Sequence, residues 1–144
     1  MTPGEMAALH ASCFDAPRPW NESEFTQILA DPLCFALLAP QGFLIGRVVL
    51  DEAELLTLAV AEKARRTGQG RALLRRFLAE STTRGAASAF LEVRADNLAA
   101  TSLYLTEGFA PAGRRRGYYT LPDGQRADAI VMTTALSAAE SAHF

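Results

Sequence analysis

The chain has 144 residues, which is enough for one compact domain and too few for two domains of ordinary size. About half of its residues (49%) are apolar and 21% are charged, which is a globular composition. The formal net charge of −2 argues against a broad surface for non-specific binding of nucleic acid.

Two short helices are expected at the start of the chain. Residues 5–12 predict the first helix, which the prolines of the segment FDAPRPW end. The second helix begins in the segment NESEF, because Asn21 and Glu24 have the spacing of a capping box. Trp20 precedes the cap and can pack on Phe25 as a hydrophobic staple.

Three apolar runs follow, over residues 33–39, 43–50 and 54–61. The segments PQG and DEA, which separate them, are too short for crossover helices. The three runs therefore predict an antiparallel meander of strands.

A helix and a strand come next. Residues 69–84 carry an apolar stripe at helical spacing, and Gly85 is the expected end of that helix. Residues 87–93 predict a strand that is buried on both faces, because the run is short and almost wholly apolar.

A second helix and two strands complete the chain. The helix is expected over residues 98–107, where Asp96 or Asn97 can cap it. Residues 109–121 and 127–136 predict two strands joined around the turn PDGQ.

This order of elements predicts an α/β protein of the α+β type, in which helices cover both faces of a mixed, mostly antiparallel sheet. We expect one domain over residues 1–144, with a weakly ordered tail at residues 136–144. No apolar run approaches the roughly 18 residues of a membrane-spanning helix, and the start of the chain does not resemble a signal peptide. A cytoplasmic protein without a membrane partner is expected.

The segment RRTGQGR, between the third strand and the long helix, combines two glycines with three arginines. Helix N-termini carry unpaired N–H groups and partial positive charge, so they can bind anions where side chains do not block access. A phosphate or pyrophosphate group would fit this segment. The alternative is a glycine-relieved turn with a solvated basic face, and these residues alone leave the two hypotheses about equal.

Two other phosphate-binding loops fit less well. A Walker loop needs Gly-Lys-Ser/Thr, which is absent here. The dinucleotide fingerprint needs a third glycine where this chain has Leu73, and residues 61–66 separate the glycines from the strand where that fingerprint has a tight turn. Glu92 does lie near the distance of the ribose-binding acid in that fingerprint.

The pattern R-x-x-G-x-G after a strand, here Arg65 to Gly70, resembles the acyl-CoA pyrophosphate loop of the GNAT N-acetyltransferases, whose fold has the same order of elements. The segments AELLTLAV, RRTGQGRALL, FLEVRADNLAATSLYLTEGF and RRGYYTLPDGQRADAIVM resemble its RimI branch, which acetylates the N-terminal alanine of a small-subunit ribosomal protein. The likeness runs from Pro19 to Met132. That family usually opens with a strand, which is missing or vestigial here, and its glycine loop commonly carries a proline and an aromatic residue.

The resemblance implies acetyl-CoA as cosubstrate and assigns cofactor contacts. Asn97 would bond the pantetheine arm, which would lie along the strand end formed by Leu58, Ala59 and Val60. The residues implied in pyrophosphate binding are Arg65, Arg66, Thr67, Gly68, Gln69, Gly70 and Arg71.

Transfer of the acetyl group to an amine needs a base, because an α-amine with a pKa of about 7.7–8.0 is largely protonated at neutral pH. Glu92 lies inside an apolar strand, where burial would raise its pKa toward that of a useful base. The alternative is a structural glutamate that bonds main-chain N–H groups or pairs with Arg94. The resemblance favours Glu92 as proton acceptor. By the same resemblance Tyr104 donates a proton to the leaving thiolate, whereas its pattern alone fits a core tyrosine.

The resemblance implies a groove for the acceptor peptide to which Trp20, Tyr118 and Tyr119 contribute, whereas their patterns alone fit a helix staple and two strand aromatics. His10 and His143 are isolated in sequence, and Cys13 and Cys34 lack zinc spacing and a base partner. We therefore expect no metal and direct transfer without an acyl-cysteine. The resemblance predicts a ribosomal-protein N-terminus as acceptor and no direct nucleic-acid partner. Alternative hypotheses are another peptide N-terminus, a lysine or a small amine, or a non-catalytic module that binds acyl-CoA or a nucleotide.

Overall fold

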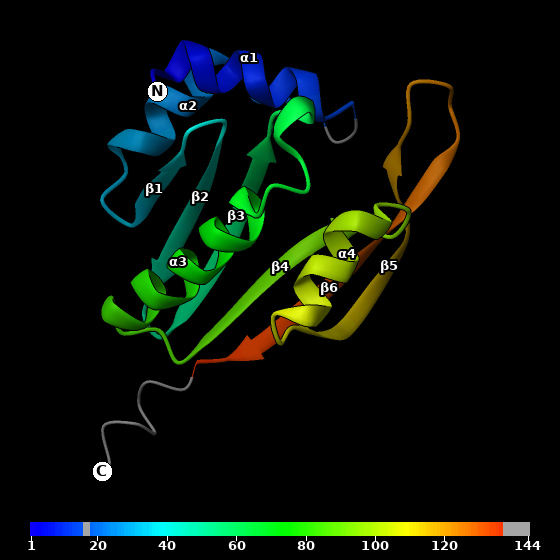
Figure 1. The fold of residues 1–144 in the computed structure, drawn as a ribbon. Helices are drawn as coiled ribbons and strands as arrows, with labels where there is room; N and C mark the ends of the chain where they lie inside the picture. Colours follow the sequence, from blue (N-terminus) through cyan, green and yellow to red (C-terminus); the bar gives the residue numbers. More distant parts are fainter. Residues whose placement is uncertain (16–17, 137–144) are drawn as a thin grey trace.

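The computed structural model describes residues 1–15 and 18–136 (Figure 1). It opens with two helices, α1 at Pro3–Cys13 and α2 at Glu22–Ala30, and no strand precedes α1 within that part of the chain. Asn21 and Glu24 form the predicted capping box at α2. A second capping box, between Thr2 and Glu5, starts α1 two residues earlier than its apolar pattern predicts.

A six-stranded sheet forms the centre of the fold, in the order β1-β2-β3-β4-β6-β5. Neighbouring strands are antiparallel except β3 and β4, which run parallel, so the predicted mixed and mostly antiparallel sheet is confirmed. The strands are β1 Cys34–Ala39, β2 Gly42–Val49, β3 Glu52–Val60, β4 Ser88–Arg94, β5 Ala110–Thr120 and β6 Arg126–Ala135.

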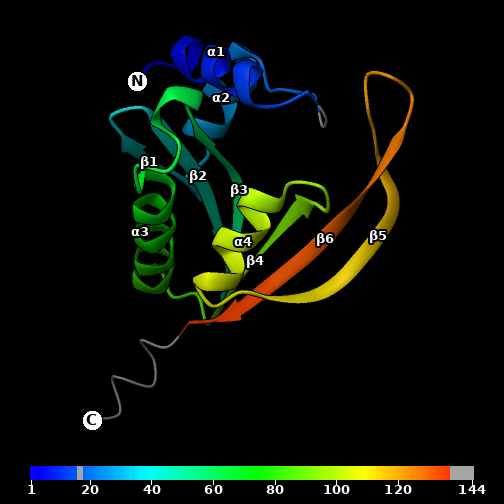
Figure 2. The ribbon, with the colours of Figure 1, turned by 45° about the vertical axis from the view of Figure 1, so that its right-hand side comes forward.

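Helices cover both faces of the sheet (Figure 2). After β3, a short 3-10 helix, η1 at Glu62–Ala64, leads into α3 at Gln69–Thr83, and α4 spans Leu98–Thr106. Because side chains alternate along a strand, neighbouring residues of β2 pack on opposite sides. Leu44 lies in the core cluster that α3 covers, whereas Phe43 and Ile45 lie in the cluster of α1 and α2.

A glycine follows each of the helices α3 and α4, and the one after α3 is the predicted end of that helix. Gly85 after α3 has a φ of +95° and Gly108 after α4 has a φ of +101°. This left-handed conformation suits glycine because a side-chain Cβ would crowd the backbone.

The parallel pair β3 and β4 is joined over a short stretch only. The paired residues are Glu52 with Ser88, Ala53 with Ala89 and Glu54 with Phe90. Beyond them the two strands diverge toward the end of the sheet that carries α1 (Figure 1). The facing edges of β3 and β4 are therefore open where the strands end.

A bulge in β3 changes the direction of side chains at this opening. Ile45 of β2 pairs with Thr57 and Gly46 with Leu55, so Leu56 has no partner on β2. As a result Thr57 and Ile45 lie toward α1, on the face opposite to Leu55.

One prediction about the sheet is wrong. Residues 87–93 were expected to be buried on both faces, but burial along β4 alternates. Ala89, Leu91 and Val93 are buried, whereas Glu92 points to the other side and is exposed. The apolar run hides this alternation because Phe90, on the side of Glu92, is itself partly buried.

The structure describes only the first residue of the predicted weakly ordered tail, Leu136. Leu136 is 9% exposed, and its N–H donates to the carbonyl of Ala87 at 3.0 Å. Residues 137–144, the rest of that tail, lie outside the described residues. None of the described helices is long and apolar enough to cross a membrane.

Candidate active site

A cleft of about 550 Å³ opens where β3 and β4 diverge. Its walls come from α1, β3, β4, α4 and β5, so segments far apart in sequence meet there. The residues predicted for catalysis and binding that line it are Trp20, Leu58, Glu92, Asn97, Tyr104, Tyr118 and Tyr119.

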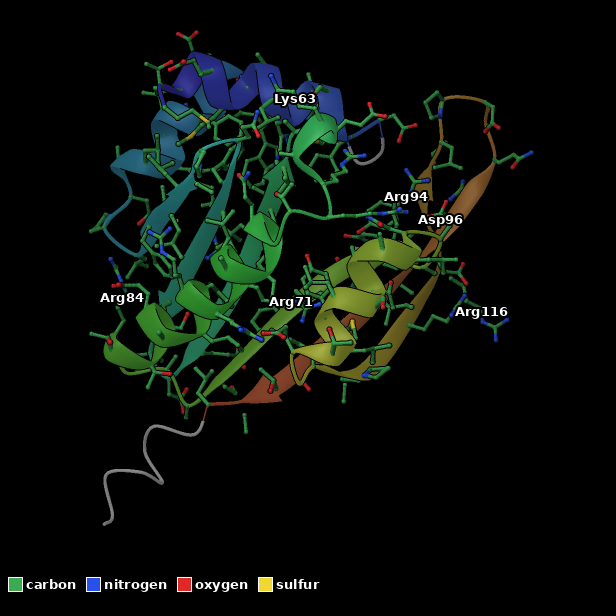
Figure 3. All side chains as sticks on the ribbon, in the orientation of Figure 1. Lys63, Arg71, Arg84, Arg94, Asp96 and Arg116 are labelled. Carbon is green, nitrogen blue, oxygen red and sulfur yellow. The ribbon has the colours of Figure 1, made fainter. Side chains whose placement is uncertain are left out.

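Glu92 projects from β4 into this cleft, and its side chain is 29% exposed. The buried setting expected for this carboxylate is not found. Its Oε2 lies 2.7 Å from Nε of Arg115 on β5, so its charged partner is Arg115 and not Arg94 as the structural alternative supposed. Arg94 instead pairs with Asp15 and Asp96, each at 2.8 Å. Figure 3 shows Arg94 and Asp96 side by side at the end of β4.

Tyr104 reaches the cleft from α4. The residue is only 6% exposed, and its ring packs edge-on against Phe109 with the centroids 5.9 Å apart. Its hydroxyl makes no hydrogen bond within residues 1–15 and 18–136, and in those residues only Ser81 Oγ is a fully buried side-chain polar atom without a partner. Burial raises the pKa of Tyr104, so the hydroxyl keeps its proton at neutral pH and can act as a donor into the cleft.

Asn97 caps α4, since its side-chain oxygen accepts from the N–H of Ala100 at 3.2 Å. Its place in the wall of the cleft leaves the side-chain amide NH₂ as a donor there. The cap and a contact to a ligand are therefore compatible, because they use different atoms of one side chain.

The three residues at the end of β3 face different ways. Leu58 lines the cleft, whereas Ala59 is 1% exposed and lies in the core cluster of α1 and α2. Val60 lies beside the glycine loop, because a carbon added at Gly70 would be 3.8 Å from Val60 Cγ2 and 3.7 Å from Leu103 Cδ2. Leu103 also lines the cleft, so the glycine loop adjoins it.

The loop presents main-chain donors at the start of α3. Ala72 donates to the carbonyl of Gly68 at 3.0 Å, so the N–H groups of Gln69, Gly70 and Arg71 have no earlier carbonyl within the helix. Gly68 has a φ of +88°, and a carbon added to it would meet nothing within 4 Å. Because three N–H groups at the helix start lack intrahelical partners and Gly68 adds no side chain beside them, the loop fits an anion.

Several side chains of the loop are bound to the protein. Thr67 donates to the carbonyl of Ala64 at 2.5 Å, and Gln69 accepts from the N–H of Gln41 at 2.9 Å. Arg71 pairs with Glu107 and so ties α3 to the end of α4; Figure 3 labels it between the two helices. Arg65 and Arg66 are exposed, so these two are the cations of the loop that remain open to solvent.

Glu107 also bonds Arg75, at 2.7 Å, and its side chain is only 8% exposed. The hydrogen bond from Arg75, followed by the one from Arg71, lowers the pKa of Glu107. A shielded carboxylate that holds two arginines fixes the packing of α3 on α4, and with it the place of Tyr104 and the glycine loop.

His10 is a residue of the cleft that its isolation in sequence did not indicate. It is 4% exposed, Nε2 lies 2.9 Å from Oγ1 of Thr57, and Nδ1 accepts from the main-chain N–H of Trp20 at 3.0 Å. Burial lowers its pKa to about 4, so the ring is neutral at physiological pH. One signal was present: His10 follows Met6, which is also buried, by four positions and so lies on the same side of α1.

The part of the chain that the structure describes has no group of three or more His, Cys, Asp or Glu side chains arranged to hold a metal ion. The thiol of Cys13 lies 3.5 Å from the carbonyl of Val60, and Cys34 lies on β1, away from the cleft lining.

Known proteins resemble this chain in sequence and in fold. Residues 5–109 match the family model described as the acetyltransferase (GNAT) family. The [ribosomal protein bS18]-alanine N-acetyltransferase of Escherichia coli strain K12 is 43% identical over 123 residues, which cover 83% of this chain and 82% of that protein. The N-alpha-acetyltransferase RimI of Mycobacterium tuberculosis is 36% identical over 135 residues, covering 88% and 82%.

Solved structures agree with this. The crystal structure of the ribosomal-protein-S18-alanine N-acetyltransferase from Escherichia coli superposes with a TM-score of 0.79 at 37% identity, covering 90% of this chain and 84% of that one. Arabidopsis thaliana NAA60 in complex with acetyl-CoA gives a TM-score of 0.81 at 19% identity, with 94% and 93% covered, which is a likeness of fold.

Proposed function

Since the chain belongs to the acetyltransferase (GNAT) family, whose members use acetyl-CoA, we propose that it transfers the acetyl group of acetyl-CoA to the N-terminal α-amine of a protein, namely the N-terminal alanine of ribosomal protein bS18. The observation that carries this proposal is the meeting of Glu92 and Tyr104 in one cleft, although they come from different elements. The acceptor is inferred from the relatives that are 43% and 36% identical.

Acetyl-CoA supplies an activated acetyl group, and the side chains of the cleft manage the protons. Glu92 accepts the proton that the α-amine loses as its nitrogen bonds to the acetyl carbon. Tyr104, which burial keeps protonated, donates its proton to the sulfur as the carbon–sulfur bond breaks. The products are an acetylated amine and a free thiol, so no acyl-cysteine is required.

The open edge of β3 is suited to the extended arm of the cosubstrate. Past Glu54 the strand has no partner on the side of β4, so its main-chain groups are available to an extended ligand. We assign Leu58, Ala59 and Val60 to this contact, and Asn97 to a hydrogen bond from its amide. The thioester oxygen would accept from a main-chain N–H at the strand end.

The glycine loop is the proposed pyrophosphate site. The main-chain N–H groups of Gln69, Gly70 and Arg71 are the donors, while Thr67 and Gly68 shape the turn. Arg65 and Arg66 add exposed charge. Since Arg71 and the Gln69 side chain are bonded to the protein, their contribution is through the main chain.

Gly70→Val is expected to weaken acetyl-CoA binding by roughly tenfold or more, because the added branches cover donors whose bonds to a charged group contribute about 1.5–3 kcal/mol. The variant should stay folded, since the first added carbon makes ordinary contacts of 3.7 and 3.8 Å. Calorimetric titration measures the affinity. Gly113→Val on β5, where an added carbon meets nothing within 4 Å, is the matched control and should bind as the native chain does. Native affinity in a folded Gly70→Val protein would reject the loop as the site.

The acceptor end of the cleft is assigned to Trp20, Tyr118 and Tyr119, which line it together with Glu92. A small amine would leave most of this aromatic wall without a ligand contact, which favours a peptide. A binding module without turnover is disfavoured because it has no need for a carboxylate and a protonated tyrosine in the same cleft. Because the proposed acceptor is a ribosomal protein, the cytoplasm is the compartment in which the enzyme would meet it.

A panel of peptides that differ only in their first residue tests the acceptor. We expect the peptide that begins with alanine to have the highest kcat/KM, and its N-terminally blocked form to be inert. Release of CoA thiol and the mass of the product give the rates. A leucine- or glutamate-first peptide that reacts faster than the alanine peptide would reject alanine specificity, and turnover of a small amine alone would reject the peptide acceptor.

A further inference from the structure

His10 joins two walls of the cleft through both ring nitrogens. A main-chain N–H can only donate, so the Trp20 N–H at 3.0 Å makes Nδ1 an acceptor. The proton of the neutral ring is then on Nε2, which donates to Oγ1 of Thr57 at 2.9 Å. The hydroxyl proton of Thr57 is therefore left to donate to a third group.

The ring is held tightly. Its centroid lies 4.6 Å from that of Phe14, 5.1 Å from Trp20, 5.4 Å from Phe25 and 6.4 Å from Phe43. With 4% of the residue exposed, the imidazole cannot turn without disturbing four aromatic neighbours. Both ring nitrogens are hydrogen-bonded, so the fixed ring holds a group on each side of it, the Trp20 main chain and the Thr57 hydroxyl.

These contacts set the position of two groups that face the acceptor. Trp20 lies just before α2 and is attached to α1 through His10, and the Trp20 ring also packs on Phe25, 5.4 Å away, as the predicted staple. Thr57 follows the bulge of β3, so its side chain is turned toward α1. Trp20, Thr57 and Glu92 all line the same cleft.

We propose that His10 is a positioning residue of the acceptor site: its neutral ring fixes Trp20 and directs the Thr57 hydroxyl proton into the cleft, where it donates to a main-chain carbonyl of the acceptor peptide. This inference rests on the proposed function for the identity of the acceptor. The carbonyl is the group that a peptide offers near its α-amine whatever its side chains are. His10 itself does not touch the reacting atoms and takes no proton.

The variants separate packing from hydrogen bonding. His10→Phe keeps an aromatic ring and removes both hydrogen bonds. His10→Gln keeps one donor and one acceptor, the nitrogen and oxygen of its amide. Both are bonded to one carbon, as the two ring nitrogens of histidine are. Thr57→Val keeps the shape of the side chain and removes the hydroxyl only. Ser81→Ala is the control, because Ser81 lies on α3 and its buried hydroxyl has no hydrogen-bond partner in the described residues.

For His10→Phe and Thr57→Val we expect the KM for the alanine peptide to rise about tenfold, the scale of one hydrogen bond, while kcat and the KM for acetyl-CoA stay within about twofold. His10→Gln should recover most of the acceptor KM, and Ser81→Ala should match the native protein. Equal changes in both KM values, or a native acceptor KM in His10→Phe, would overturn the proposal.

Trp20 is the single tryptophan of the chain, so its fluorescence reports on the site without any assay of transfer. His10→Phe should shift the emission to longer wavelength and increase quenching by acrylamide, whereas His10→Gln and Thr57→Val should not. Unchanged emission and quenching in His10→Phe would overturn the positioning of Trp20. Hydrogen exchange in the native protein gives the same test if that variant does not fold: a protected Trp20 amide supports the proposal and rapid exchange contradicts it. These readouts hold even if the acceptor proves to be a different amine.

Discussion

Glu92→Gln is expected to lower kcat by roughly 10²–10⁴, the usual contribution of a general base. The substitution keeps the size of the side chain and its place on β4 but removes the basic carboxylate. Acetyl-CoA affinity should barely change, because Glu92 lies on the wall opposite the β3 edge and away from the glycine loop. Single-turnover kinetics with saturating peptide, together with calorimetric titration of acetyl-CoA, measures both quantities.

Arg115→Gln is the matched control for the base. It removes the ion pair at 2.7 Å and leaves the carboxylate in place. An ion pair with a side chain that is 58% exposed contributes about 0–1 kcal/mol, so kcat should fall by less than about tenfold. If Glu92→Gln retained near-native turnover at every pH, or lost no more than Arg115→Gln, Glu92 would be a structural residue only.

Tyr104→Phe should lower kcat by roughly 10²-fold or more with little change in melting temperature. The ring and its packing on Phe109 are kept, and the hydroxyl makes no hydrogen bond in the described part of the chain, so its removal breaks no protein contact. We expect the free energy of unfolding to change by about 0.5 kcal/mol or less, which is the low end of the contribution of a hydrogen bond, 0.5–1.5 kcal/mol. Rates and thermal unfolding measured on one preparation separate the two effects.

The loss at Tyr104 should be smaller than the loss at Glu92. A CoA thiol resembles an ordinary thiol with a pKa of about 8.5, so its thiolate can leave without a proton at some cost in rate. The protonated amine, by contrast, cannot attack at all. Full turnover in a stable Tyr104→Phe protein would leave the tyrosine as a packing residue.

Patterns among residues that are close in sequence were predicted well. The stripe of α3, the meander of β1 to β3, the capping box of Asn21 and the staple of Trp20 on Phe25 are all present. Each depends on residues a few positions apart, whose relation the backbone period determines.

Pairings across the sheet were not predictable in the same way. The partner of Glu92 is Arg115, two strands away in the sheet, and the nearer Arg94 was the natural choice from sequence alone. Arg71 was assigned to the cofactor for its place beside the glycines, yet Glu107 holds its side chain. Both outcomes depend on how strands and helices pack, which local spacing does not contain.

The role of His10 was hidden for a related reason. Its partners Thr57 and Trp20 lie 47 and 10 residues away, and the bulge that turns Thr57 toward α1 depends on the register of β2 with β3. A histidine on the buried side of a helix indicates that its nitrogens need partners, but it does not identify them.

The central claim, that this chain acetylates an N-terminal α-amine, is tested most directly with one peptide that offers both kinds of amine. A peptide beginning with alanine and carrying an internal lysine is incubated with the enzyme and acetyl-CoA, and fragment mass spectrometry locates the acetyl group. The α-amine has a pKa about 2.5 units below that of lysine, so at neutral pH far more of it is in the neutral form that can attack the thioester. We predict acetylation at the N-terminus with the lysine unmodified at early times. Acetylation of the lysine first, or at an equal rate, would contradict the account.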